Sequence, residues 1–209
     1  MLRDIVYYTQ VLLEAAVGVI GIRPYEEPRY AVLATLPDGV EIRRYAPRLA
    51  AQVAVPADGA AARNEAFRIL FRYITGGNVA AEKIEMTVPV ATNARTEKIA
   101  MTVPVESASR DGGLQMQFFL PARYTAQTAP RPADERIRIV PVAEETVAVL
   151  RFSGRGTAQE LARREAELLE ALATTAWRPA GDPAILFYDA PSTLPFLRRN
   201  EAAVRVDRR

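Results

Sequence analysis

Short apolar runs typical of β-strands recur along this chain, and turn-forming residues separate them. The first two runs, residues 30–36 and 40–45, flank Pro37-Asp38-Gly39, whose Asp-Gly pair suits the positive φ angles of a tight turn. We therefore predict two strands joined by that turn. The further strands predicted from the same pattern cover residues 51–55, 114–120, 137–140, 147–152, 184–188 and 202–206.

Two other stretches carry apolar residues at the spacing of an α-helix. The first is predicted to begin at Asp58, a good N-cap, and to end near Thr75, because Gly76-Gly77-Asn78 stops a helix. The second is predicted over residues 157–174, because Thr157 and Glu160 form a capping box. The apolar positions of the first helix are Ala62, Ala66, Ile69, Leu70 and Tyr73, and Phe67, Phe71 and Ile74 widen this stripe.

Each half of the chain is thus predicted to be strands followed by one helix, which indicates an internal pseudo-repeat. We predict an α+β fold: a distorted antiparallel β-barrel of two pseudo-repeated halves with two flanking helices. The length of 209 residues fits one such domain, predicted over residues 24–209, with an appendage before it.

The appendage is residues 1–23, most of which is the apolar segment 5–22. As a helix this segment would be about 27 Å long, close to the roughly 30 Å hydrocarbon thickness of a bilayer. Its polar and small residues fall on one stripe, which predicts docking to a protein partner through Gln10, Glu14 and Gly18. We expect a membrane-embedded helix. The alternative is a cytoplasmic protein whose helix packs on its own domain or on a twin subunit.

A cleavable signal peptide is disfavoured, because no net basic excess precedes the apolar segment and no clear cleavage site follows it.

Composition excludes several kinds of site. The chain contains neither Cys nor His, and its formal net charge is +2. The lack of Cys excludes disulfides, thiolate metal sites and cysteine nucleophiles, and the lack of His removes the usual general base and the commonest axial ligand of haem iron. Nucleic-acid binding normally needs a concentrated basic surface, so we expect no nucleic-acid partner.

The clearest motif is a local duplication. Residues 82–90 recur as residues 97–105, with eight of nine positions identical at an offset of 15. Each copy is predicted to be a short strand that ends at a proline. We expect Met86 and Met101 to occupy equivalent, buried positions. The two copies are either framework strands alone or strands that also contact a ligand through these methionines.

This K-I-x-M-T-x-P-V motif resembles that of the SOUL haem-binding family. Further matches to the family follow in the same order along the chain, at residues 41–45, 73–78, 118–121, 151–154 and 196–201. The resemblance covers roughly residues 25 to 206, nearly the whole predicted domain.

The resemblance implies a shallow apolar site for haem or another tetrapyrrole beside the first helix. Transferred by position, Phe67 and Phe71 would form its apolar walls, and Arg72 would pair with a propionate. The alternatives are core packing for the two Phe and a solvated helix face for Arg72. Because His is absent, an axial His is impossible, while a Tyr or Met could still ligate iron. Binding without ligation is the simpler expectation, and it would equally accept a metal-free porphyrin, a chlorophyll precursor or an open-chain bilin.

Three functions follow from these features. The first is a tetrapyrrole carrier, and the second is an accessory or scaffold subunit of a membrane complex, based on the striped N-terminal segment. The third is a small-molecule hydrolase, because the halves resemble, more distantly, the gyrase-inhibitor-like domains. Glu85 or Glu145 would then be the base, but no nucleophile–base pair is visible. We therefore expect a binding protein rather than an enzyme.

Overall fold

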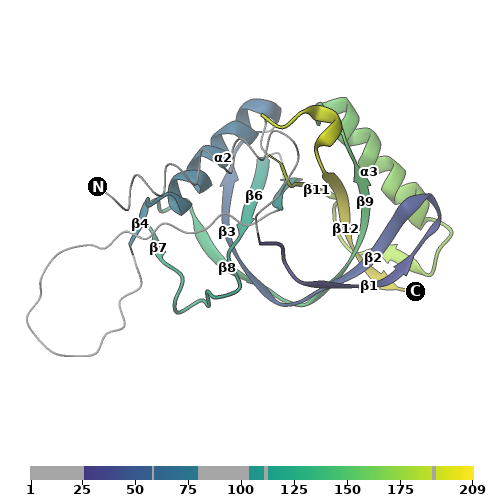
Figure 1. Cartoon of the computed structure of the whole chain (residues 1–209), viewed down its shortest axis with the longest axis horizontal. Coiled ribbons are helices and arrows are strands. Elements are labelled where there is room, and N and C mark those ends of the chain that lie inside the picture. Colours follow the sequence, from purple (N-terminus) through teal and green to yellow (C-terminus); the bar gives the residue numbers. More distant parts are fainter. Residues whose placement is uncertain (1–25, 58, 80–103, 111–112, 190–191) are drawn as a thin grey trace, which may run out of the picture. The chain divides into compact units, whose positions relative to one another are not determined.

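The computed structural model describes residues 26–57, 59–79, 104–110, 113–189 and 192–209. These residues divide into two compact units: unit 1 contains Tyr30–Arg44 and Thr146–Arg209, and unit 2 contains Glu27–Arg29 and Tyr45–Glu145. Each unit has antiparallel strand pairs and one α-helix, as Figure 1 shows. The predicted α+β class, antiparallel pairing and two helices are confirmed.

Unit 2 has one helix and a four-stranded sheet. Strand β3 pairs antiparallel with both β6 and β8, and β6 pairs with β5, so the order is β8-β3-β6-β5. Strands β4 and β7 form a separate two-stranded ribbon. The elements are β3 (Arg48–Val55), α2 (Gly59–Ile74), β4 (Asn78–Val79), β5 (Val105–Arg110), β6 (Gly113–Phe119), β7 (Arg131–Pro132) and β8 (Arg138–Val142).

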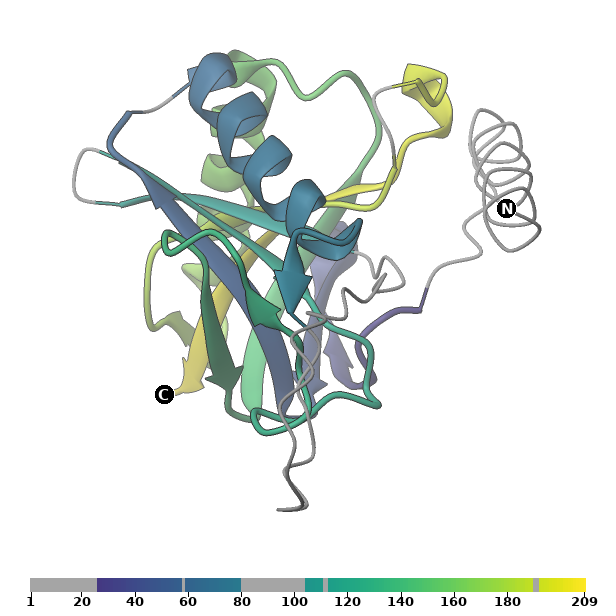
Figure 2. The ribbon, with the colours of Figure 1, turned by 90° about the vertical axis from the view of Figure 1, so that its left-hand side faces the viewer.

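Helix α2 covers one face of this sheet, over β3 and β6 (Figure 2). The strand period of two places alternate residues on that face, and the register pairs Ala51 with Phe118 and Val53 with Met116. These residues are buried, and the Phe118 ring contacts Phe67 of α2. The apolar stripe of α2 therefore packs on the apolar face of β3 and β6, as the sequence pattern predicts.

Unit 1 repeats this plan with a longer sheet. The strands lie in the order β1-β2-β9-β12-β11, and β10 pairs with the far end of β12. Helix α3 packs on β12, β10 and β11 through Leu161, Leu168 and Leu172. The elements are β1 (Tyr30–Thr35), η1 (Pro37–Gly39), β2 (Val40–Tyr45), β9 (Glu145–Phe152), α3 (Ala158–Leu172), β10 (Trp177–Pro179), β11 (Ala184–Phe187), η2 (Pro195–Leu197) and β12 (Asn200–Arg208).

The internal repeat is visible in the pairing. In unit 2, β3 leads to α2, and the later strands form the order β3-β6-β5. In unit 1, β9 leads to α3, and the later strands form the equivalent order β9-β12-β11. Each helix therefore lies between strands rather than after them. Closure of both halves into one barrel stays a prediction, and the N-terminal helix of residues 1–23 lies outside the described residues.

Two local predictions are confirmed and one is corrected. Asp38 and Gly39 have φ angles of 64° and 76° in the turn between β1 and β2. Helix α2 ends at Ile74, and Gly76 then adopts a φ of 117°. The capping box at α3 is only half formed: the Thr157 hydroxyl accepts from the Glu160 N–H at 3.3 Å, but the Glu160 carboxylate accepts from the N–H of Gly156. Gly154 of the preceding loop also lies against that carboxylate, where a Cβ would collide with Glu160 Oε1.

Candidate ligand-binding site

Helix α2 presents two aromatic rings beside its buried stripe. Phe67 and Phe71 are one turn apart, with ring centroids 5.7 Å apart and planes 15° from parallel. Phe67 is half-buried, while Phe71 is 40% exposed. We call this stacked pair the aromatic shelf.

The aromatic shelf packs on the sheet of unit 2. The Phe67 ring lies 5.4 Å from that of Phe118, at a tilt of 58°, and Phe118 is buried in β6. The inner ring of the shelf is therefore fixed by the core, and the outer ring of Phe71 stacks on it. Such an arrangement offers an apolar surface to a flat ligand, since aromatic rings pack favourably in offset-stacked or edge-to-face arrangements.

Arg72 lies beside a pocket of about 480 Å³ between the end of α2 and residues 133–137. Ile69 and Tyr73 form part of its wall, and the Tyr73 hydroxyl is engaged, because it donates to the Pro130 carbonyl at 2.8 Å. Arg72 has no ion-pair partner within the described part of the chain. Its guanidinium is therefore available to an anionic group at the pocket.

An ion pair forms the opposite wall of this pocket. Asp134 accepts two hydrogen bonds from the Arg136 guanidinium, at 2.9 and 2.7 Å. These bonds, with the charges of Arg136 and Arg72, lower the pKa of Asp134 from its ordinary 3.8 to about 2. The carboxylate of Asp134 is thus charged at all physiological pH values, and it occupies Arg136 but not Arg72.

The shelf and the pocket flank α2 on different sides. Successive residues of a helix are turned by about 100°, so Phe71 and Arg72 point in clearly different directions. Of the residues expected to form one site, the structure brings Phe67 and Phe71 together, and it places Arg72 at the neighbouring pocket. A ligand that contacts all three must cross the exposed ridge of the helix.

The remaining predicted site residues lie outside the described residues. Met86 and Met101 belong to residues 80–103, and Gln10, Glu14 and Gly18 belong to residues 1–25. Their predicted burial, ligand contact and partner docking stay predictions. No helix in the described ranges is long and apolar enough to cross a membrane.

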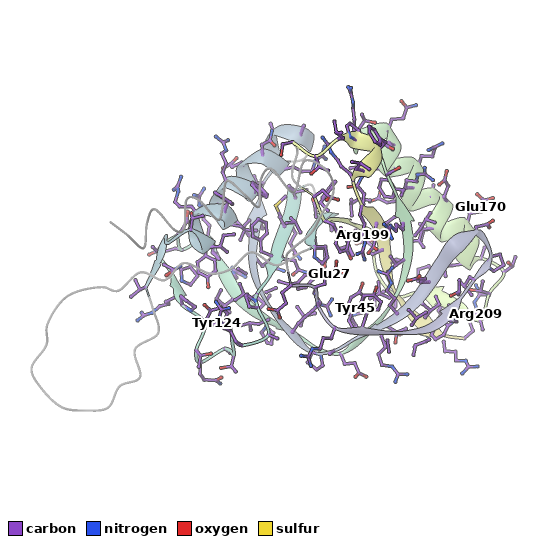
Figure 3. All side chains as sticks on the ribbon, viewed as in Figure 1. Glu27, Tyr45, Tyr124, Glu170, Arg199 and Arg209 are labelled. Carbon is purple, nitrogen blue, oxygen red and sulfur yellow. The ribbon has the colours of Figure 1, made fainter. Side chains whose placement is uncertain are left out.

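A buried ionic cluster in unit 1 was not foreseen from the sequence. Glu201 of β12 is completely buried, and its carboxylate accepts from Arg43 at 2.9 Å, from Arg199 at 2.8 and 2.9 Å, and from the Tyr188 hydroxyl at 2.6 Å. Arg199, labelled in Figure 3, also lies over the Tyr188 ring at 3.8 Å. The only sequence signal was the position of Arg199 and Glu201 in the family-like segment 196–201.

This cluster is built for structure rather than for catalysis. Both oxygens of Glu201 are occupied by charged or hydroxyl donors, so the carboxylate has no free direction toward a substrate. A second carboxylate, Glu145, accepts from Arg48 at 2.5 Å. Among the described residues there is no group of acidic side chains arranged to hold a metal ion.

Solved structures share this fold at low sequence identity. The C-terminal domain of EcmrR superposes with a TM-score of 0.58 at 6% identity, over 81% of this chain and 98% of that one. The EcmrR–DNA complex gives 0.58 at 8% identity, over 100% and 65% of the two chains. A hydrolase encoded by lin2189 from Listeria innocua gives 0.52 at 12% identity, over 80% and 91%. At these identities the likeness shows the fold alone.

A family comparison is more specific. No curated protein matches this chain. The model described as "SOUL heme-binding protein" matches residues 25–205, nearly the whole of the 209-residue chain, which confirms the resemblance seen in the sequence motifs. The chain belongs to the SOUL haem-binding protein family.

Proposed function

We propose that this chain binds haem or a related tetrapyrrole non-covalently on α2, with the macrocycle on the aromatic shelf of Phe67 and Phe71. The family indicates a tetrapyrrole as the ligand class. The observation that supports this place is the stacked ring pair, whose outer member Phe71 is 40% exposed although it is a large apolar side chain. A flat, apolar macrocycle would cover it.

The neighbouring pocket supplies the polar part of this proposal. A tetrapyrrole carries propionate groups at its edge, and a guanidinium suits a carboxylate because it offers two parallel donors and stays charged. Arg72 lines the pocket and has no ion-pair partner among the described residues. In the proposed complex Arg72 pairs with one propionate while the ring system rests on the shelf.

The residues present fit binding by apolar burial. The chain has no His, so an imidazole cannot ligate iron. Tyr73 is 1% exposed and its hydroxyl is bonded to Pro130, which withdraws it from iron ligation. The proposal therefore makes the presence of iron unimportant, and haem, a metal-free porphyrin and a bilin should bind with similar affinity.

Calorimetric titration tests this function directly. We expect haemin, protoporphyrin and biliverdin to bind in the micromolar range, about −8 kcal/mol. Absence of binding by all three would refute the carrier function. A much tighter complex with haemin alone, with the spectrum of ligated iron, would refute binding by burial.

Two features bear on the hydrolase alternative. Glu145, one of the two candidate bases, is held by Arg48, and the other, Glu85, lies outside the described residues. The likeness to a Listeria hydrolase concerns the fold. Binding without catalysis is therefore the function that we propose.

We further propose that the protein is membrane-associated through residues 1–22 and meets a protein partner along the Gln10–Glu14–Gly18 stripe. This rests on the apolar sequence of residues 5–22. Fractionation of native cells tests it. The full-length protein should sediment with membranes, and recovery of all of it in the high-speed supernatant, monodisperse without detergent, would favour a soluble dimer helix.

A further inference from the structure

An apolar turn precedes β12 in unit 1. Leu194, Phe196 and Leu197 are 42%, 71% and 36% exposed, and Pro195 lies among them. Phe196 is the most exposed large apolar side chain in the described part of the chain. We call residues 194–197 the apolar tip, which in Figure 2 is the yellow turn that stands clear of the strand after it. Single exposed apolar residues are common, but three within four residues form a patch that calls for a partner surface.

Three backbone groups of the tip, the Leu197 N–H and the carbonyls of Leu194 and Pro195, are hydrogen-bonded. The Leu197 N–H donates to the Leu194 carbonyl at 2.9 Å. The Pro195 carbonyl accepts from the N–H groups of Gly154 and Arg198, at 3.0 and 3.3 Å, and Pro195 itself has no N–H. A peptide group that is already hydrogen-bonded within the protein pays only a small desolvation cost when it leaves water. Backbone groups that enter an apolar medium need such internal bonds.

The base of the tip is fixed. Thr193 is 1% exposed, and its carbonyl accepts from Arg198 Nε at 2.8 Å. The Arg199 N–H donates to Asp189 Oδ2 at 2.6 Å. The exposure of Phe196 therefore belongs to a turn that is held in place from both sides.

Cationic residues border the tip. Arg198 follows it directly, and the exposed Arg155 lies in the loop whose Gly154 bonds to Pro195. Arg155 makes no ion pair with any residue that the structure describes. Apolar side chains beside arginines are the combination that suits the headgroup level of a bilayer, where apolar groups enter the acyl boundary and guanidinium groups meet phosphates.

We infer that the apolar tip is a contact site for an anionic lipid surface, with Phe196 in the acyl boundary and Arg155 and Arg198 at the lipid phosphates. A protein partner is less well suited, because specific protein interfaces bury about 800 Å² on each side and require a matching shape. The tip is a turn of four residues, and a bilayer needs no matching shape. This contact is separate from residues 1–22 and from the site proposed in unit 2.

The lack of Cys allows a local test on the full-length protein. Ser192→Cys, at an exposed position beside the tip, can carry a single nitrobenzoxadiazole label, whose emission shifts to the blue in apolar surroundings. We expect a blue shift with vesicles of phosphatidylcholine and phosphatidylglycerol, and a much smaller one with phosphatidylcholine alone. Adding Phe196→Ser should lower the inserted fraction about tenfold, since it removes most of the buried apolar area.

Val32→Ser is the matched control, because Val32 is 51% exposed on β1 of the same unit, and it should leave the shift unchanged. Circular dichroism of the Phe196→Ser protein should match the wild type. No shift on the mixed vesicles, an equal shift on neutral vesicles, or a shift that survives Phe196→Ser would overturn the inference. Attachment through the N-terminal segment alone gives either no shift at the label or a shift that survives Phe196→Ser, so the two contacts are distinguishable.

Discussion

Helices α2 and α3 hold equivalent places in the two units, yet they present different surfaces. Each follows a long strand and packs on the sheet of its own unit. On α3 the exposed side carries ion pairs, with Glu167 3.6 Å from Arg163 and 2.8 Å from Arg164. On α2 the flank of the buried stripe carries the stacked rings of Phe67 and Phe71.

The two helices share an apolar buried stripe, but their exposed flanks differ. The buried stripes of both helices are apolar, because packing on a sheet requires it. The exposed flank of α3 needs no partner, since charged pairs are well solvated. The exposed flank of α2 leaves an aromatic ring in water. Unit 2 thus carries the proposed ligand surface, while the most elaborate polar contacts of unit 1, those of Glu201, are buried in its core.

The largest effect is expected when this buried cluster is broken. Glu201→Ala removes the buried carboxylate that Arg43 and Arg199 share, although Arg43 keeps its ion pair with Glu41, and it should lower the free energy of unfolding by about 3–5 kcal/mol. Urea denaturation measures this. The folded fraction should still bind haemin with wild-type affinity. A loss of less than about 1 kcal/mol, outside the range for such pairs, would show that the cluster does not hold unit 1 together.

A charge on the shelf should be the largest perturbation of binding. Phe71→Asp places a carboxylate where the macrocycle would rest and should weaken haemin binding by about 2 kcal/mol, roughly 30-fold. Because Phe71 is 40% exposed, the unfolding free energy should change by less than about 0.5 kcal/mol. Ala166→Asp, at an exposed position of α3, is the control and should bind normally. If both variants weakened haemin binding equally, the added negative charge rather than its position on α2 would explain the loss.

Removal of the guanidinium at the pocket should have a smaller effect. Arg72→Ala should weaken haemin binding by about 1 kcal/mol, roughly fivefold, because a solvent-accessible ion pair is lost. Protoporphyrin dimethyl ester, which lacks free propionates, should bind both proteins equally in the same titration. A fivefold loss for the ester as well would assign Arg72 to packing rather than to carboxylate recognition.

The smallest effect concerns pH and Asp134. Its folded pKa of about 2 lies below the ordinary 3.8, so the carboxylate stabilises the fold above about pH 4. This contribution is lost as the pH falls through 2. The stability difference between wild type and Asp134→Asn should therefore be constant from neutral pH to about pH 4 and shrink below it. Thermal unfolding across this range measures the difference. A stability difference that grows on acidification would contradict a lowered pKa for Asp134.

Much of the fold could be predicted from the chain because its elements have strong local signals. The Asp38-Gly39 turn, the apolar stripe of α2 and the N-cap at Thr157 depend on neighbouring residues alone. Strand β5 has no strand pattern in its sequence, because Val-Glu-Ser-Ala-Ser-Arg is mostly polar and small, and its pairing with β6 sets its conformation.

The candidate site was predictable in its residues but not in its geometry. The helical period places Phe67 and Phe71 on one stripe, and their stacking follows. The pocket beside Arg72 depends on residues 133–137, some sixty positions later, and no local sequence pattern predicts that contact. Likewise, Glu201 meets Arg43 across 158 positions, so its burial could not be foreseen from a pattern of charges.

Paramagnetic broadening by haemin tests the central claim, that α2 rather than α3 carries the ligand surface. In amide spectra of the labelled full-length protein, signals of residues 67–75 should broaden as haemin is added, and those of Ala158–Leu172 should not. The same pattern, shifted rather than broadened, should appear with metal-free protoporphyrin. Broadening centred on α3, or on neither helix while haemin binds, would contradict the assignment of the site to the aromatic shelf.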